Sequence, residues 1–493
     1  MPTRILLVAW LLLPLASSSH AQGKSVEARI AQLEEKLGLL GKSSVEASTA
    51  LQALRDLQRR TRELERLATA KKTVDRGYKA LRAQLDDVHE RLENLQLQLT
   101  AVSMHSAERA RLVHDGGFAL RAGRHFEMRL GGLLQAGYLG RLVSEERDYA
   151  GNTSLGAHSS ELTLPRARVG LSGHLFDPRM HYVLGLEFGG RGAEGLLDAY
   201  MQFGIPRISV SAGLMRVPFG RQFSRDFEHL LFEDRAPTTL VFHPGRDMGL
   251  RVHGALWDNE RFGRLGMEMG IFNGGGDTPF SDNNTDFLYV TRLVYEPLGP
   301  LGGHESDSER SSRPRLAVGG SFMFNLAPTD AAMRAGVVDP TNAAQLRDAD
   351  GDGEVDNIGV YSAAAEVALA WRGLSVQGEL FYRHEDPGAV AESQSYWGAY
   401  GQLAARHGSG LEAAARYSYW ELHRFGEDGT SVAPGTVHEL ALALTAWQWN
   451  DGLKLQTSYA YRVMHDMGDR QGNSAADDQL RAHLLTVVAQ VAW

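Results

Sequence analysis

The chain closes with Arg481-Ala-His-Leu-Leu-Thr-Val-Val-Ala-Gln-Val-Ala-Trp493, the stretch around which the rest of the sequence is considered. Every second residue back from the end is apolar, in the row Trp493, Val491, Ala489, Val487 and Leu485. Successive side chains of a strand point to opposite faces, so the stretch is predicted to be a β-strand with one apolar face. An exposed apolar edge strand invites aggregation. A soluble sandwich avoids this by burying the strand, and a membrane barrel avoids it by pairing its last strand with its first.

Composition limits the class of protein. The chain has 493 residues, so at least two regions are expected, and its net charge of −9 gives no sign of nucleic-acid binding. It contains no cysteine, which excludes a thiol nucleophile, a disulfide scaffold and a cysteine-ligated metal. Beyond the N-terminus no apolar run approaches the ~20 residues of a transmembrane helix. If the protein spans a membrane, it must do so as a barrel.

Residues 1–21 are predicted to be a secretory signal peptide. Arg4 precedes an apolar run from Ile5 to Ala16, and small residues, Ser19 and Ala21, stand three and one before the expected cleavage point. The apolar run is too short for a transmembrane anchor. The protein is therefore expected to be exported.

Residues 22–114 are predicted to form an α-helical coiled coil. Apolar residues recur in steps of three and four without proline, clearest in the series Val74, Tyr78, Leu81, Leu85, Val88, Leu92, Leu95, Leu99 and Val102. Gly38 and Gly41 interrupt the repeat, which favours two coils with a hinged joint over one rod. An amphipathic helix packed on its own domain is the alternative.

From residue 115 to the C-terminus the period changes to two, which predicts an all-β transmembrane barrel of sixteen antiparallel strands. The predicted strands are 125–138, 161–173, 180–189, 196–204, 208–216, 245–257, 265–273, 286–296, 315–325, 359–371, 374–383, 396–405, 411–420, 437–449, 453–463 and 481–493. Connections at one end are mostly tight and at the other mostly long, as in outer-membrane barrels. The segment 297–314 breaks this rule, so either it is a real insertion or the strand count slips there.

Polar and apolar residues alternate along these strands, but this alternation fits a soluble sandwich as well as a barrel. The predicted export, the sixteen segments, the asymmetric loops and the terminal aromatic strand together favour the membrane barrel.

Short motifs in this region resemble those of the phosphate-selective porins O and P. They are Gly117-Phe-Ala-Leu-Arg121, Pro165-Arg-Ala-Arg-Val-Gly170, Gly213-Leu-Met-Arg-Val-Pro-Phe-Gly220, Gly245-Arg-Asp-Met-Gly-Leu250, Ile271-Phe-Asn-Gly-Gly275 and Leu288-Tyr-Val-Thr-Arg-Leu-Val-Tyr-Glu-Pro297. The resemblance covers residues 115–493 in the same order. It implies a trimeric, sixteen-stranded outer-membrane channel for anions, in some members with an N-terminal coiled coil, and a long third loop (217–243) that narrows the lumen.

Arginine is the expected anion-binding residue, because its planar fork binds two oxygens of an oxyanion at once. The candidate pore-lining and anion-binding residues are Arg166, Arg168, Arg216, Arg221, Arg225, Arg235, Arg246, Arg251 and Arg292. The alternative is that these arginines pair with the acids of the third loop and brace it. Only one lysine, Lys454, follows Gly116, whereas phosphate-selective members use lysine clusters. The resemblance therefore supports a porin better than it supports phosphate selectivity.

A candidate calcium loop lies in the fifth long connection. Asp348, Asp350, Asp352 and Asp356 take positions one, three, five and nine around Gly353, as in the first part of a calcium-binding loop. Position twelve is Gly359, so the EF-hand is incomplete, and a solvated acidic turn is the alternative.

Three functions remain to be compared. The first is a passive outer-membrane channel for small solutes, with anions preferred. The second is a structural tether, in which the barrel anchors a periplasmic coiled coil that reaches a partner in another envelope layer. The third is a barrel enzyme using His253 and Asp247, but no spacing recommends a catalytic set, so the protein is not expected to be an enzyme. The expected partners are small anions, outer-membrane lipid and two further copies in a homotrimer.

Overall fold

The computed structural model describes residues 111–114, 118–144, 158–190, 195–259, 261–274, 286–328, 357–386, 393–422, 435–448, 452–465 and 479–493, together with 59–60, 62–63, 86–87, 90–91 and 93. The chain divides into two compact units, Met1–Ala110 and Arg111–Trp493. The second unit begins four residues before the predicted boundary at residue 115.

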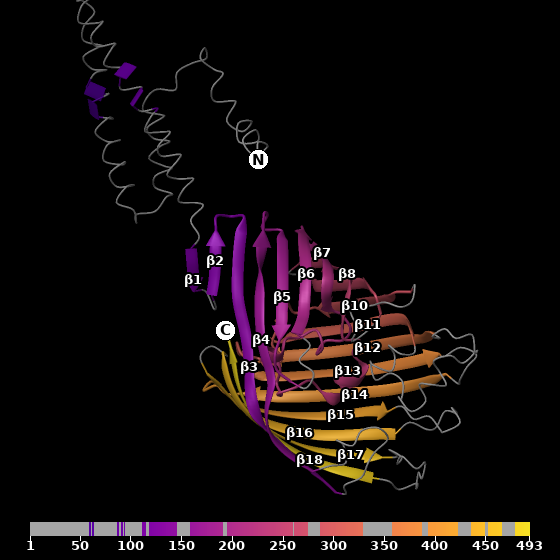
Figure 1. The fold of residues 1–493 in the computed structure, drawn as a ribbon. Helices are drawn as coiled ribbons and strands as arrows, with labels where there is room; N and C mark the ends of the chain where they lie inside the picture. Colours follow the sequence, from indigo (N-terminus) through magenta and orange to yellow (C-terminus); the bar gives the residue numbers. More distant parts are fainter. Residues whose placement is uncertain are drawn as a thin grey trace, which may run out of the picture. The chain divides into compact units, whose positions relative to one another are not determined.

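The second unit is a closed antiparallel β-barrel (Figure 1). Its sixteen strands are β3 (Phe126–Val143), β4 (Ser159–Leu175), β5 (Met180–Glu187), β6 (Gly195–Ile205), β7 (Ile208–Arg216), β8 (Arg246–Asn259), β9 (Gly263–Phe272), β10 (Leu288–Glu296), β11 (Arg315–Pro328), β12 (Asn357–Trp371), β13 (Leu374–Asp386), β14 (Gln394–Arg406), β15 (Leu411–Leu422), β16 (Gly435–Gln448), β17 (Leu453–His465) and β18 (Gln479–Ala492). Each strand pairs with the next, and β18 pairs with β3. The predicted sixteen-stranded barrel is confirmed.

The barrel closes where the sequence pattern predicts. Strand β18 runs antiparallel to β3, from Ala482 opposite Val143 to Ala492 opposite Leu133. Two short strands, β1 (Arg111–His114) and β2 (Phe118–Ala122), come in addition to the sixteen. Strand β2 pairs with the first five residues of β3, beyond the point where β18 ends, so β3 stays paired along almost its whole length.

The barrel wall is polar inside and apolar outside. On β13, Gln377 and Glu379 are each 3% exposed, whereas the alternate residues Val376 and Leu380 are 49% and 47% exposed. A soluble sandwich would bury the apolar row and expose the polar one, because water solvates polar groups. The observed arrangement suits a wall that faces lipid, and it decides between the two readings of the alternation.

Aromatic side chains lie on the outer surface near both ends of the strands. Trp257, Tyr295, Trp371 and Trp493 stand at the ends of β8, β10, β12 and β18, all more than a third exposed. Tyr289, Tyr361 and Trp397 stand toward the opposite ends of β10, β12 and β14 and are equally exposed. Two aromatic belts of this kind mark the interfaces of a membrane with water.

The connections differ between the two ends of the barrel. At one end most are short, such as 206–207 and 372–373, and at the other most are long, such as 217–245 and 329–356. The exception is 297–314, between β10 and β11 at the short-turn end. The strands on both sides of it keep their register, so this segment is a real insertion and the strand count does not slip.

Several predictions from the sequence fall outside the described residues. The signal peptide lies there, as do most of the predicted coiled coil and the candidate calcium ligands Asp348, Asp350, Asp352 and Asp356. The few described residues between 59 and 93 are helical and exposed. Among all described residues, no helix is long and apolar enough to span a bilayer.

Candidate functional site

The connection between β7 and β8, residues 217–245, crosses the inside of the barrel, and we call it the constriction loop. It contains η2 (Phe227–His229) and α5 (Pro237–Phe242). Thr238 Oγ1 donates to the carbonyl oxygens of Ala399 (3.3 Å) and Tyr419 (3.1 Å), which belong to β14 and β15. A loop that leaves β7 can reach those strands only by passing through the lumen.

Charged side chains of the wall hold the backbone of this loop. Lys454 Nζ donates to Leu230 O (2.8 Å), Arg416 to Asp234 O (3.1 Å) and Arg383 to Phe242 O (3.0 Å). In the opposite sense, the Glu379 carboxylate accepts hydrogen bonds from the backbone N–H groups of Arg221 and Gln222. Charge-assisted hydrogen bonds are stronger than neutral ones, so the loop is fixed to one half of the barrel wall.

Arginines of the loop and of β4 surround one phenylalanine. The guanidinium carbons of Arg166 and Arg235 lie 3.4 and 4.0 Å from the centre of the Phe227 ring, and that of Arg168 lies 4.7 Å away. Arg235 also donates to three loop carbonyl oxygens, the closest that of Arg225 at 2.6 Å. These arginines stabilise the loop through cation–π and backbone contacts.

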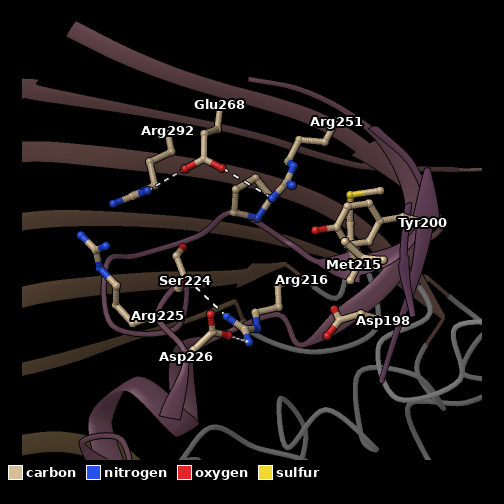
Figure 2. A pocket seen from close by; sticks show the side chains of 12 residues that line it. Asp198, Tyr200, Met215, Arg216, Ser224, Arg225, Asp226, Arg251, Glu268 and Arg292 are labelled. Carbon is tan, nitrogen blue, oxygen red and sulfur yellow. Dashed lines mark hydrogen bonds and ion pairs between the residues drawn. The ribbon is translucent and has the colours of Figure 1, made fainter. Parts of the chain in front are cut away.

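On the other side of the loop a cavity of about 420 Å³ remains between the loop and strands β5–β10 (Figure 2). Its charged lining residues are Asp198, Arg216, Arg225, Asp226, Arg251, Glu268 and Arg292. Tyr200, Ser224, Val183, Met215 and Pro218 complete it. Four arginines and three carboxylates give the cavity lining a net positive charge. Arg292 reduces this charge, because it also pairs with Glu366, which is outside the lining.

Three of the four cavity arginines face a carboxylate. Arg292 binds both oxygens of Glu366 (2.9 and 2.8 Å) and also donates to Glu268 (2.7 Å). Arg251 Nη1 lies 3.7 Å from Glu268, an ion pair too long for a good hydrogen bond. Arg216 donates to Asp226 and to the Ser224 carbonyl oxygen (3.3 Å). Most of the positive charge is therefore already balanced.

The fourth arginine, Arg225, extends from the constriction loop without a carboxylate partner (Figure 2). Among the residues that the structure describes, no acid lies within ion-pair distance of its guanidinium group. The Nε atoms of Arg216 and Arg251 are buried and lack a hydrogen-bond acceptor in the same part of the chain. The guanidinium group of Arg225 and the net positive charge of the lining therefore suit a ligand with several oxygens at this cavity.

The nine candidate arginines fall into distinct groups. Arg216, Arg225, Arg251 and Arg292 line the cavity. Arg246 is held by both oxygens of Asp198, and Arg168 pairs with Glu187. Arg166 binds Asp234 and Gln135. Arg221 is 2% exposed and donates to Gln377, and Arg235 braces the loop backbone.

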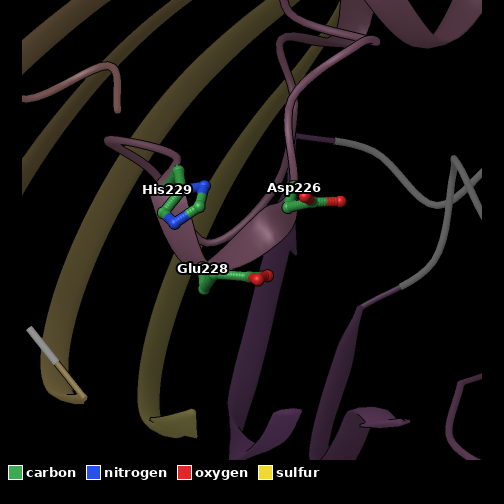
Figure 3. Close-up of side chains that lie close together, drawn as sticks. All are labelled: Asp226, Glu228 and His229. Atoms are coloured by element: carbon green, nitrogen blue, oxygen red, sulfur yellow. The ribbon is translucent and has the colours of Figure 1, made fainter. Parts of the chain in front are cut away.

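Asp226, Glu228 and His229 form the one group of described residues whose ligand atoms could meet at a metal ion (Figure 3). Asp226 already pairs with Arg216, and the rings of His229 and His304 lie 4.0 Å apart. The nearby arginine charges oppose a cation, so the arrangement serves ion pairing within the loop better than metal binding.

The enzyme hypothesis considered Asp247 and His253, and these two residues have different partners. Asp247 accepts a hydrogen bond from the Gly274 N–H, and His253 contacts Gln202.

Several residues important for this site are not among the residues predicted from the sequence. They are the buried carboxylates Glu305, Glu366 and Glu379, and Lys454 in its role as an anchor of the loop. The inward alternation of β12, β13 and β17 places Glu366, Glu379 and Lys454 on the lumen side. No periodic signal marks Glu305, because it lies in the insertion.

Known proteins resemble this chain in sequence or in fold. The sequence model of the phosphate-selective porins O and P matches residues 140–493. A comparison with curated proteins found no match. Similar solved structures include an anion-selective porin from Comamonas acidovorans, with 11% identity over 74% of this chain and 99% of the porin and a TM-score of 0.47. They also include the channel DcaP of Acinetobacter baumannii, with 10% identity over 74% and 97% of the two chains and a TM-score of 0.46.

The family match covers well over half of the chain, and the closed barrel has the strand number and wall polarity of an outer-membrane porin. This protein belongs to the phosphate-selective porin O and P family of outer-membrane proteins.

Proposed function

We propose that this protein forms a water-filled channel through which small anions diffuse passively across the outer membrane. The proposal is carried by Arg225, which lines the cavity beside the constriction loop and whose guanidinium group has no carboxylate partner in the described structure. A channel selects by the charges and donors at its narrowest part. Donors without acceptors favour a passing ion that brings its own oxygens.

The expected solutes are oxyanions, phosphate among them, and small organic carboxylates. Guanidinium groups bind such ions in a bidentate manner and retain their charge at every physiological pH. The selectivity should be moderate, because Asp198, Asp226 and Glu268 face the same cavity. Lys454 is not placed to bind a passing phosphate ion, because its ammonium group is buried and donates to the carbonyl oxygen of Leu230 in the loop.

Planar-bilayer recording of the purified protein tests this function. The expected result is stepwise conductance, with a reversal potential under a salt gradient that indicates preference for the anion. Absence of conductance from correctly folded protein would contradict the channel, and preference for the cation would contradict the anion proposal.

Three further expectations accompany this function. We propose a homotrimer whose outer barrel surfaces contact each other and lipid, and an N-terminal coiled coil that extends into the periplasm toward a partner there. Calcium binding by Asp348, Asp350, Asp352 and Asp356 stays a prediction. Cross-linking of the protein in native membranes and calcium titration of the purified barrel test the oligomer and the metal.

A further inference from the structure

The insertion 297–314 folds back into the lumen from the short-turn end of the barrel and docks on the wall. Ser306 Oγ donates to Glu412 on β15 (2.5 Å), and Gly373 N, in the turn before β13, donates to Asp307 (2.7 Å). The Asp307 carboxylate also accepts from Ser311 N–H (3.0 Å), which closes the insertion on itself. Glu305, Ser306, Asp307 and Ser311 are all buried, so this segment is an ordered part of the lumen.

Glu305 joins the insertion to the constriction loop. Its carboxylate accepts hydrogen bonds from Leu231 N, Gln222 Nε2 and Gln377 Nε2, each 2.9 Å long. Its backbone N–H donates to His229 O (3.0 Å). Leu231, Gln222 and His229 belong to the loop and Gln377 to β13, so a single residue connects the insertion, the loop and the wall.

The bond from Gln222 to Glu305 is one of the contacts that fix the orientation of the Gln222 amide. With Nε2 donating to Glu305, Gln222 Oε1 accepts from Ala236 N (2.8 Å) and Thr239 Oγ1 (2.9 Å). Gln222 therefore connects the first limb of the constriction loop to the start of α5. If the Glu305 acceptor were lost, the Gln222 NH₂ group would lose this partner and the first limb of the loop would be held less firmly.

Arg225 depends on the same connection. Its backbone N–H donates to Gln222 O (3.1 Å). Its guanidinium group lies beside the insertion, because a Cβ on Gly303 would stand 3.9 Å from Arg225 Nη1. The base of the Arg225 side chain is thus bonded to Gln222, which Glu305 holds, and its tip lies near the insertion that contains Glu305.

We propose that Glu305 is a positioning residue of the channel: its carboxylate holds the first limb of the constriction loop and thereby sets the width of the lumen and the placement of Arg225. This proposal rests on the proposed anion channel. Glu305 does not contact the permeating ion, since it is buried and three donors already surround its oxygens.

The test compares Glu305→Gln with Glu309→Gln. The first substitution keeps the size of the side chain but presents an NH₂ group to donors. The second removes the same charge from the same insertion at an exposed residue that pairs only with Arg315 in the described structure. Heat-modifiable gel migration selects variants with a folded barrel. Bilayer recording should show higher conductance and lower anion preference for Glu305→Gln, and wild-type values for Glu309→Gln.

A second measurement separates this proposal from the channel function. The chain has no cysteine, so Ser224→Cys, at the cavity beside Arg225, provides a unique thiol. Its rate of maleimide labelling should rise when Glu305→Gln is added, and stay constant when Glu309→Gln is added. If folded Glu305→Gln matched wild type in both conductance and labelling, the proposal would be wrong. If wild type failed to conduct while labelling still rose, the positioning role would hold and the channel function would fail.

Discussion

Gly132 and Trp493 exchange both of their backbone hydrogen bonds across the closure of the barrel. Gly132 N donates to Trp493 O at 3.0 Å, and Trp493 N donates to Gly132 O at 3.1 Å. The Trp493 indole lies over the glycine: a Cβ on Gly132 would stand 2.2 Å from the nearest ring atom. The last residue of the chain thus fills the space that the absent side chain of β3 leaves open.

Replacing Gly132 with valine should weaken the closure of the barrel. The added side chain displaces the indole, and such overpacking costs about 1–3 kcal/mol. The measurement is the temperature at which the barrel unfolds, followed by gel migration. Gly401→Val on β14 is the matched control, because a Cβ at Gly401 has no atom within 4 Å. Equal unfolding temperatures for both variants would show that the contact is not needed.

Deleting Trp493 should impair insertion into the outer membrane and leave export intact. The deletion removes the last pair of hydrogen bonds to β3 and one member of the aromatic belt. Membrane fractionation of cells that produce the truncated chain measures the inserted and periplasmic amounts. Normal insertion of the truncated chain would show that Trp493 is not needed for insertion of the barrel.

Replacing Arg225 with glutamine should reduce anion preference. The guanidinium group has no carboxylate partner in the described structure, so its charge acts on the solute. The anion-to-cation permeability ratio should fall by roughly fivefold, which corresponds to about 1 kcal/mol of lost attraction. Arg261→Gln removes the same charge from an exposed turn between β8 and β9 and should leave the reversal potential unchanged. Equal shifts in the two variants would indicate a general charge effect.

Replacing Glu268 with glutamine should have the opposite effect. This carboxylate balances Arg251 and part of Arg292, whereas Arg292 keeps its two bonds to Glu366. Removal of the negative charge leaves Arg251 without an ion-pair partner at the cavity, so anion preference should rise. Reversal potentials under a salt gradient measure the change. A shift toward the cation would mean that Glu268 acts mainly by holding Arg292 in place.

The sequence by itself determined the number and order of the barrel strands. Segments such as 374–383 and 453–463 alternate between polar and apolar residues, and the alternation follows directly from the backbone geometry of a strand. The same local rule marked the terminal strand that pairs with β3. The alternation did not predict β2, because the five residues from Phe118 to Ala122 are too few to establish a period.

Only the tertiary structure decided which face of the wall meets lipid and which arginines face the cavity. Gln377 and Val376 alternate equally well in a soluble sheet, and the direction of each row became known only when the barrel closed and the polar row lay inside. Arg225 and Arg235 stand ten residues apart in one loop, yet one extends into the cavity and the other donates to the loop backbone. Their difference depends on contacts between distant segments, such as Lys454 with Leu230 and Glu305 with Leu231. Periodicity describes the direction of a side chain from its own backbone, whereas the position of a loop inside a barrel depends on partners that the chain brings together across the lumen.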